Sequence, residues 1–82
     1  MENEEIGREL KANELKVRTV VVLGREDRDV HYTTWVTEIG GDSVVFYSGV
    51  SKTYFIAYLR EDGQLVDDTG KRIIVNEYLG AI

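Results

Sequence analysis

Apolar and polar residues alternate along much of the chain from residue 15 onward. Residues 15–23 begin with strict alternation and are rich in β-branched side chains, a pattern typical of an extended strand. Similar segments follow, separated by clusters of Gly, Asp and Ser that favour turns. The pattern predicts six strands, at residues 15–23, 30–39, 43–48, 53–60, 64–66 and 71–79.

Turn residues support this division, because every glycine except Gly7 falls between the predicted strands or directly after the last of them. Five or six short antiparallel strands most often close into a barrel, since closure removes exposed strand edges. We therefore predict a mainly β fold: a small antiparallel meander that forms an SH3-like or OB-like barrel or a curled sheet. A flat sheet with an N-terminal helix across one face is the alternative.

The first fourteen residues differ in character from residues 15–82, which we expect to form a single β domain. This arm carries five acidic and two basic residues, so it holds −3 of the net charge of −5. Its acidic start favours a short helix over residues 4–12, with Ile6 and Leu10 on the apolar face. A helix this short is marginal alone, so it must dock on the sheet or fray.

Alternation divides the strands into two sets of side chains, one for each face. The set richest in aliphatic residues is assigned to the core: Leu15, Val17, Val21, Leu23, Val30, Tyr32, Val36, Val44, Phe46, Phe55, Ala57, Leu59, Ile73, Val75 and Leu79. The complementary set is also mostly apolar and holds four of the five tyrosines and the single tryptophan: Val20, Val22, His31, Trp35, Ile39, Val45, Tyr47, Tyr54, Ile56, Tyr58, Ile74 and Tyr78.

A second apolar face in so small a domain must be shielded from water, and four arrangements could shield it. A closed barrel with a docked helix buries much of it. A partner protein or a second copy of the chain can cover it, because Tyr and Trp are favoured at interfaces. Exposed aromatic residues on small barrels also stack single-stranded bases. The fourth cover is a small molecule in the mouth of a barrel.

Composition narrows these choices. Fifteen acidic against ten basic residues argue against a general nucleic-acid binder and against an anionic membrane surface. The absence of cysteine excludes disulfides, thiolate zinc sites and a cysteine nucleophile. The acidic start does not resemble a secretory signal, and no apolar run is long enough to span a membrane, so we expect a cytoplasmic protein.

Candidate chemistry is sparse. Asp68-Thr69-Gly70 spells the triplet of aspartic proteases, but Asp67 and Lys71 on either side would add charges beside the catalytic pair, so we interpret the triplet as a turn. His31 is the only histidine, and no glycine pattern fits a phosphate-binding loop. The sequence predicts no catalytic residues, no metal site and no cofactor.

The resulting hypothesis is a non-enzymatic module that binds a protein partner or a second copy of itself. An acidic inhibitor or accessory factor of phage or prophage type fits its size and charge. A single-strand-binding barrel that uses the same aromatic residues is the alternative. The predicted binding residues are Trp35, Tyr47, Tyr54, Tyr58 and Tyr78, with the acids Glu61, Asp62, Asp67 and Asp68.

Overall fold

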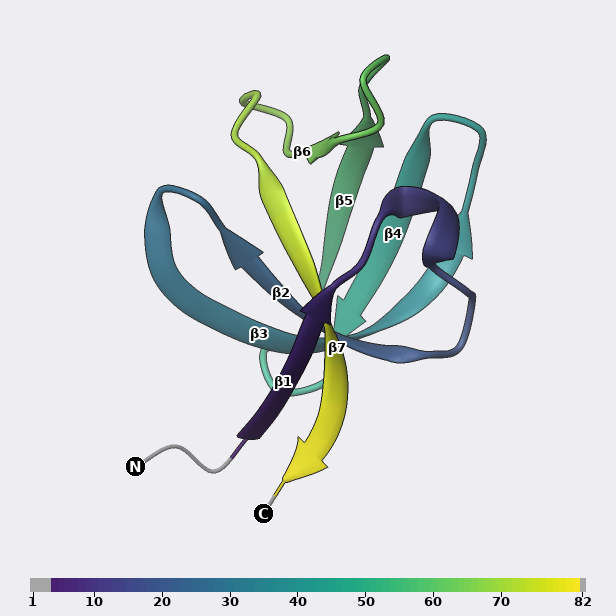
Figure 1. The fold of residues 1–82 in the computed structure, drawn as a ribbon. Coiled ribbons are helices and arrows are strands. Elements are labelled where there is room, and N and C mark those ends of the chain that lie inside the picture. The colour runs from purple at the N-terminus through teal and green to yellow at the C-terminus, as the bar shows by residue number, and fades with distance from the viewer. Residues whose placement is uncertain (1–3, 82) are drawn as a thin grey trace.

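The computed structural model describes residues 4–81, which form one antiparallel sheet and a single short 3-10 turn (Figure 1). The elements follow the order β1 (Glu4–Glu9), η1 (Ala12–Glu14), β2 (Val20–Arg25), β3 (Arg28–Ile39), β4 (Ser43–Ser48), β5 (Thr53–Leu59), β6 (Leu65–Val66) and β7 (Ile73–Ala81). The mainly β prediction is confirmed.

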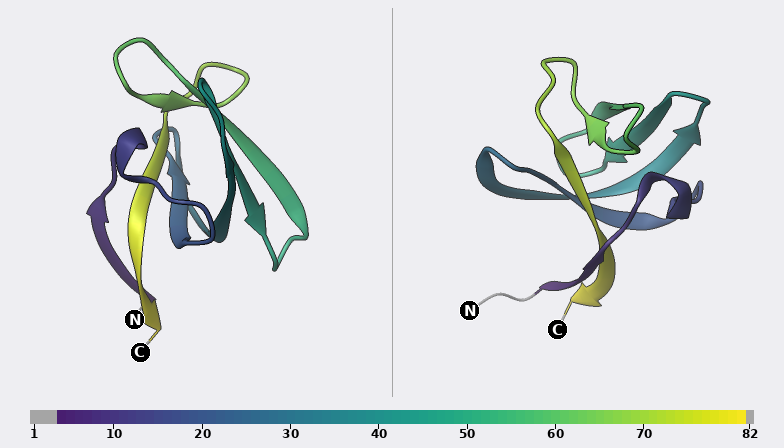
Figure 2. Two further views of the ribbon diagram at one scale, coloured as in Figure 1. Left: turned by 90° about the vertical axis from the view of Figure 1, so that its right-hand side faces the viewer. Right: turned by 45° about the horizontal axis from the view of Figure 1, so that its top comes forward.

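The strands lie in the order β1-β7-β2-β3-β4-β5-β6, with every pair antiparallel. The sheet is strongly curled, so its β5–β6 end turns back toward the start of β7 (Figure 2). One bridge, between Val66 and Arg72, joins these regions. The predicted barrel is therefore not closed, because β6 has only two residues with which to bridge the gap.

The core lies inside this curl. Its buried members come from β2, β3, β4, β5, β6, β7 and the loop before β2: Leu15, Val21, Leu23, Val36, Val44, Phe46, Ala57, Leu65 and Val75. All but Leu65 were predicted from the alternation. Other predicted core residues lie beyond the enclosed part and remain exposed, namely Val17, Tyr32, Leu59 and Leu79.

The predicted N-terminal helix is wrong, because residues 4–9 form a strand that pairs with β7. The Asn76 amide donates to the Gly7 carbonyl at 3.0 Å, and Arg72 forms an ion pair with Glu9. A short helix containing glycine has little intrinsic stability, whereas the edge of β7 offers unpaired backbone groups. Residues 1–3 of the predicted arm lie outside the described residues.

Two further differences concern strand geometry. Residues 15–19, predicted as the start of a strand, form a loop in which Arg18 has a positive φ of 72° and its amide donates to the Val36 carbonyl. In β3 a bulge between Val36 and Glu38 shifts the alternation. Ile39 is therefore paired with the core residue Val44 and lies on the inner face, not on the outer face as predicted.

Gly7 distinguishes the strand from the predicted helix experimentally. A Cβ at this position would lie 2.7 Å from the Glu77 Cβ, so Gly7→Ala should lower the free energy of unfolding by about 1 to 3 kcal/mol. In a helix the same change would stabilise by about 1 kcal/mol. Urea unfolding measures the difference. Gly41→Ala is the control, because nothing lies within 4 Å of its added Cβ, and it should change stability by less than about 0.5 kcal/mol.

Candidate functional site: an aromatic row and an open cleft

Three aromatic residues of the predicted binding face lie side by side on adjacent strands. Trp35 of β3 is paired with Tyr47 of β4, which is paired with Tyr54 of β5. The two tyrosine rings pack at 4.8 Å between centroids with an interplanar angle of 54°. With strands about 4.8 Å apart, the three residues cross about 10 Å of the sheet. We call Trp35, Tyr47 and Tyr54 the aromatic row.

The aromatic row is largely open to solvent. Trp35 is 57% exposed and Tyr54 is 64% exposed, while Tyr47 between them is half-buried. Val17, 45% exposed in the loop before β2, lines the same hollow as Trp35. By contrast, Val22 on this face of β2 is fully buried. The surplus apolar surface is thus covered at the centre of the sheet and concentrated on β3, β4 and β5.

Basic residues stand at both ends of the aromatic row. Arg18 lines the hollow beside Trp35, and Lys52 lies in the β4–β5 turn, two residues before Tyr54. Neither forms an ion pair within residues 4–81, although most of the other basic residues do. The one acid of β3 near this region, Glu38, lies opposite Val45. Each end of the row therefore has a basic residue nearby, while Glu38 lies on the same face of the sheet beside Trp35.

The other predicted binding residues are separated from this row. Tyr58 lies toward the far end of β5, where it pairs with Ser43 and Val66. Tyr78 is half-buried on β7, opposite Ile6 of β1. The four predicted acids occupy the loops on either side of β6, at the end of β5 opposite to Tyr54. The structure thus unites Trp35, Tyr47 and Tyr54 but not the acids with them.

Asp67 is committed to its own turn. Its Oδ1 accepts hydrogen bonds from the Thr69 hydroxyl at 2.7 Å and from the amides of Thr69 and Lys71 at 2.9 Å each. These bonds, the hydroxyl's above all, lower the pKa of the Asp67 carboxyl below its usual range. Gly70 follows with φ of 89°, so the turn predicted for the Asp68-Thr69-Gly70 triplet is confirmed.

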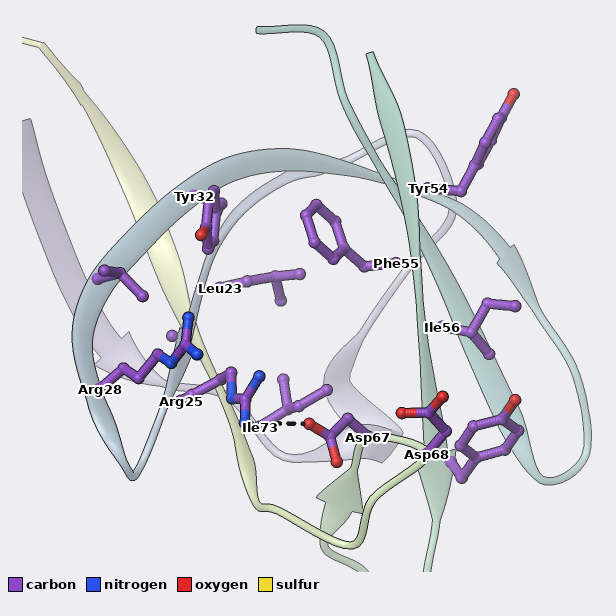
Figure 3. A pocket seen from close by; sticks show the side chains of 13 residues that line it. Leu23, Arg25, Arg28, Tyr32, Tyr54, Phe55, Ile56, Asp67, Asp68 and Ile73 are labelled. Carbon is purple, nitrogen blue, oxygen red and sulfur yellow. Dashed lines mark ion pairs between the residues drawn. The ribbon is translucent and has the colours of Figure 1, made fainter. Parts of the chain in front are cut away.

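A cleft of about 390 Å³ opens on the inner side of the sheet, between the β2–β3 hairpin and β5 (Figure 3). Leu23, Tyr32 and Phe55 point into it. The Tyr32 and Phe55 rings lie 5.3 Å apart between centroids. The rim is charged and consists of Arg25, Arg28, Asp67 and Asp68. The sequence pattern placed Tyr32 and Phe55 in the core and did not predict the cleft.

Residues that could act as metal ligands do not form a cluster in the part of the chain that the structure describes. Residues 4–81 contain no group of three or more His, Asp or Glu side chains placed to hold a metal ion. His31 is exposed on β3, with Gly24 of the neighbouring strand opposite it. No helix within residues 4–81 has the length and apolarity needed to cross a membrane.

The chain matches no protein-family model, and no curated protein or solved structure shows significant similarity to it. Inferences about its function therefore depend on its own geometry. That geometry includes two candidate sites, the aromatic row and the cleft.

Asp67 and Asp68 differ in role, and substitution separates them. Asp67→Ala removes the acceptor of three solvent-exposed hydrogen bonds, which water replaces in part, and should cost about 0.5 to 1.5 kcal/mol at pH 7. Asp68→Ala should change stability by less than about 0.5 kcal/mol, because Asp68 is exposed and forms no hydrogen bond or ion pair with residues 4–81. Thermal or urea unfolding measures both variants.

The same contacts predict a pH dependence. Because the pKa of Asp67 is lower in the folded chain than its unfolded value of about 3.9, its contribution is complete above that value. The contribution is lost as the pH falls through the folded pKa. The difference between wild type and Asp67→Ala should therefore shrink below pH of about 4. A difference that grows on acidification would contradict this assignment.

Proposed function

We propose that this chain is a non-enzymatic binding module that docks on another protein through the aromatic row. The observation that carries the proposal is the exposure of Trp35 and Tyr54 on either side of Tyr47, on strands held in register by backbone pairing. Small antiparallel barrels of the SH3-like and OB-like type present binding faces on their strands, and we place this curled sheet beside them in architecture.

Energetics support a protein partner for the aromatic row. Large aromatic side chains with a polar edge supply much of the binding energy at protein interfaces. A domain of this size has only about 4 to 12 kcal/mol of net stability, so exposed apolar surface is an aggregation liability unless it has a use. Backbone pairing of β3, β4 and β5 also holds the residues of the row in place, which reduces the entropy lost on binding.

The acidic loops do not belong to the proposed docking surface. Glu61, Asp62 and Asp68 are exposed at the opposite end of β5 from Tyr54, and Asp67 is occupied in its turn. An inhibitor or accessory factor of phage or prophage type remains compatible with the row. In that form, the acids would steer long-range approach to a basic partner rather than make the contact.

Trp35→Ala tests the proposal. It should weaken binding about 30-fold or more, as expected for a hot spot of at least 2 kcal/mol, while costing less than about 1 kcal/mol of folding stability. A protein captured from the native host by the wild-type chain is purified, and its dissociation constants for wild type and variant are compared. Leu79→Ala is the matched control, because Leu79 is 59% exposed on β7, away from the row. An equal loss of binding affinity in Trp35→Ala and Leu79→Ala would contradict docking on the aromatic row.

The second candidate is binding of single-stranded nucleic acid, and the positions of Arg18 and Lys52 favour it specifically. Cations at both ends of an aromatic platform can contact phosphates while bases stack on the rings. The net charge of −5 opposes such binding at long range. The row therefore supports this function less well than it supports docking on a protein.

A labelled oligothymidylate separates the two candidates. Protein docking predicts no measurable binding of the oligonucleotide at any salt concentration. The hypothesis of nucleic-acid binding predicts an affinity that falls roughly sevenfold between 50 and 200 mM salt, if Arg18 and Lys52 each contact one phosphate. Fluorescence anisotropy measures it, and salt-sensitive binding that is lost in Trp35→Ala would replace the first proposal by the second.

A further inference from the structure

The two edges of β5 differ in their hydrogen bonding. The Leu59 amide donates to the Asp42 carbonyl at 2.8 Å, which shows that odd-numbered residues direct their backbone groups toward β4. The Arg60 amide donates to the Gln64 carbonyl at 2.8 Å, on the other side of the strand. Even-numbered residues of β5 therefore direct their amides and carbonyls to the edge opposite β4.

That edge is paired over only part of its length. β6 pairs with Tyr58 and Leu59 and extends no further. The backbone amides and carbonyls of Tyr54 and Ile56 consequently have no strand partner within residues 4–81. An unpaired edge of this kind is a template for another strand.

The unpaired edge borders the cleft. Tyr54 and Ile56 line the cleft, yet their side chains point away from it, whereas Phe55 between them points inward (Figure 3). The cleft thus meets their backbone. A strand laid along this edge would gain hydrogen bonds from Tyr54 and Ile56 and place alternate side chains over Phe55, Tyr32 and Leu23.

The charged residues at the rim of the cleft add a second requirement that a ligand must meet. Arg25 is engaged by Asp27 at 3.1 Å and by Asp67 at 3.5 Å. Arg28, on the same rim, is exposed and has no ion pair within residues 4–81. A carboxylate on the ligand would satisfy it. Asp68, across the cleft, also has no ion pair within residues 4–81 and can accept a basic residue of the ligand.

We propose that the cleft binds an extended peptide segment of another protein, which adds as a strand to the free edge of β5. Its apolar side chains, two residues apart, enter the cleft, and an acidic residue at one end contacts Arg28. Tyr54 contributes its ring to the aromatic row and its backbone to this edge, but the cleft lies on the other face of the sheet and the proposal goes beyond the function proposed above.

A second copy of this chain fits the cleft less well. A copy could offer its own free β5 edge, which within residues 4–81 presents unpaired backbone groups only at Tyr54 and Ile56. It could also offer β1, whose sequence has Ile6 as its only large apolar residue between acids and Arg8. A nucleic acid has no backbone groups that pair with a strand edge in this pattern. The edge presents unpaired backbone groups at Tyr54 and Ile56, and the Phe55 side chain between them points into the cleft. This arrangement suits an extended peptide.

Selection from a phage-displayed library of random dodecapeptides, followed by amide hydrogen exchange with the selected synthetic peptides, tests the proposal. In the free chain the amides of Tyr54 and Ile56 should exchange rapidly and those of Phe55 and Ala57 slowly. Bound peptide should slow exchange at Tyr54 and Ile56 by tenfold or more. The selected peptides should share alternating apolar residues and a flanking acid.

Substitutions at Ile56 separate backbone pairing from side-chain contact. Ile56→Pro removes an amide that does not bond to β4, a position at which an edge strand tolerates proline, and should lower peptide affinity at least tenfold. Ile56→Thr keeps the amide and should bind within threefold of wild type. Arg28→Glu should weaken peptides with the acidic residue and favour those with a basic one.

Three results would overturn the proposal. One is the absence of enriched peptides, and another is enriched peptides that leave the Tyr54 and Ile56 amides unprotected. The third is protection of those amides at high protein concentration without peptide, which would assign the edge to a second copy of the chain. If Ile56→Pro fails to fold, the exchange measurement on the wild-type chain still decides.

Discussion

Burial of one shared core by strands from opposite halves of the sheet is the constraint on which this structure depends. Val75 of β7 and Leu65 of β6 belong to the same buried cluster as Phe46 of β4. In the strand order, β7 and β6 are separated by β2, β3, β4 and β5. They reach a common core only because the sheet curls. A flat sheet of the same strands would expose this layer and forfeit about 25 cal/mol for each Å² of apolar surface.

The curl also explains where the molecule is open. Closure rests on a two-residue strand and the bridge between Val66 and Arg72, so it covers only the last part of β5. β4 pairs only with the part of β3 from Trp35 to Ile39. The cleft lies where the pairing of β5 with β6 and the pairing of β3 with β4 both end. The ion pair between Arg25 and Asp67 spans its rim. The openings are thus consequences of strand length and require no movement of the chain.

Features fixed by local chemistry could be predicted from the sequence. The strand at residues 43–48 and the turn around Gly70 are as expected, because glycine and aspartate determine turns within a few residues. β1 was missed because its stability comes from pairing with β7, about 70 residues away in the chain. The bulge in β3 was missed for a similar reason, since it follows from the fit to β4 and not from residues near Thr37.

The candidate site, too, could be predicted from the sequence only in part. Alternation correctly placed Trp35, Tyr47 and Tyr54 on one face, but only the register shows that they are adjacent and that the acids lie elsewhere. The cleft had one signal in the sequence: a predicted strand at residues 30–39 is longer than its partner at 43–48, so part of it must lack a neighbour on that side. Which edge of β5 each backbone amide faces follows from the hydrogen bonds to the neighbouring strands, and it cannot be predicted from the pattern of side chains.

The central claim is that a stably folded, unaccompanied chain leaves its aromatic row in water. Trp35 is the only tryptophan, so its fluorescence reports on the row directly. The structure predicts that, in the folded free chain, Trp35 emits at the wavelength of a water-exposed indole and is readily quenched by acrylamide, at every protein concentration. Blue-shifted emission that resists quenching in the dilute, monomeric chain would show that the row is already covered and would contradict the account.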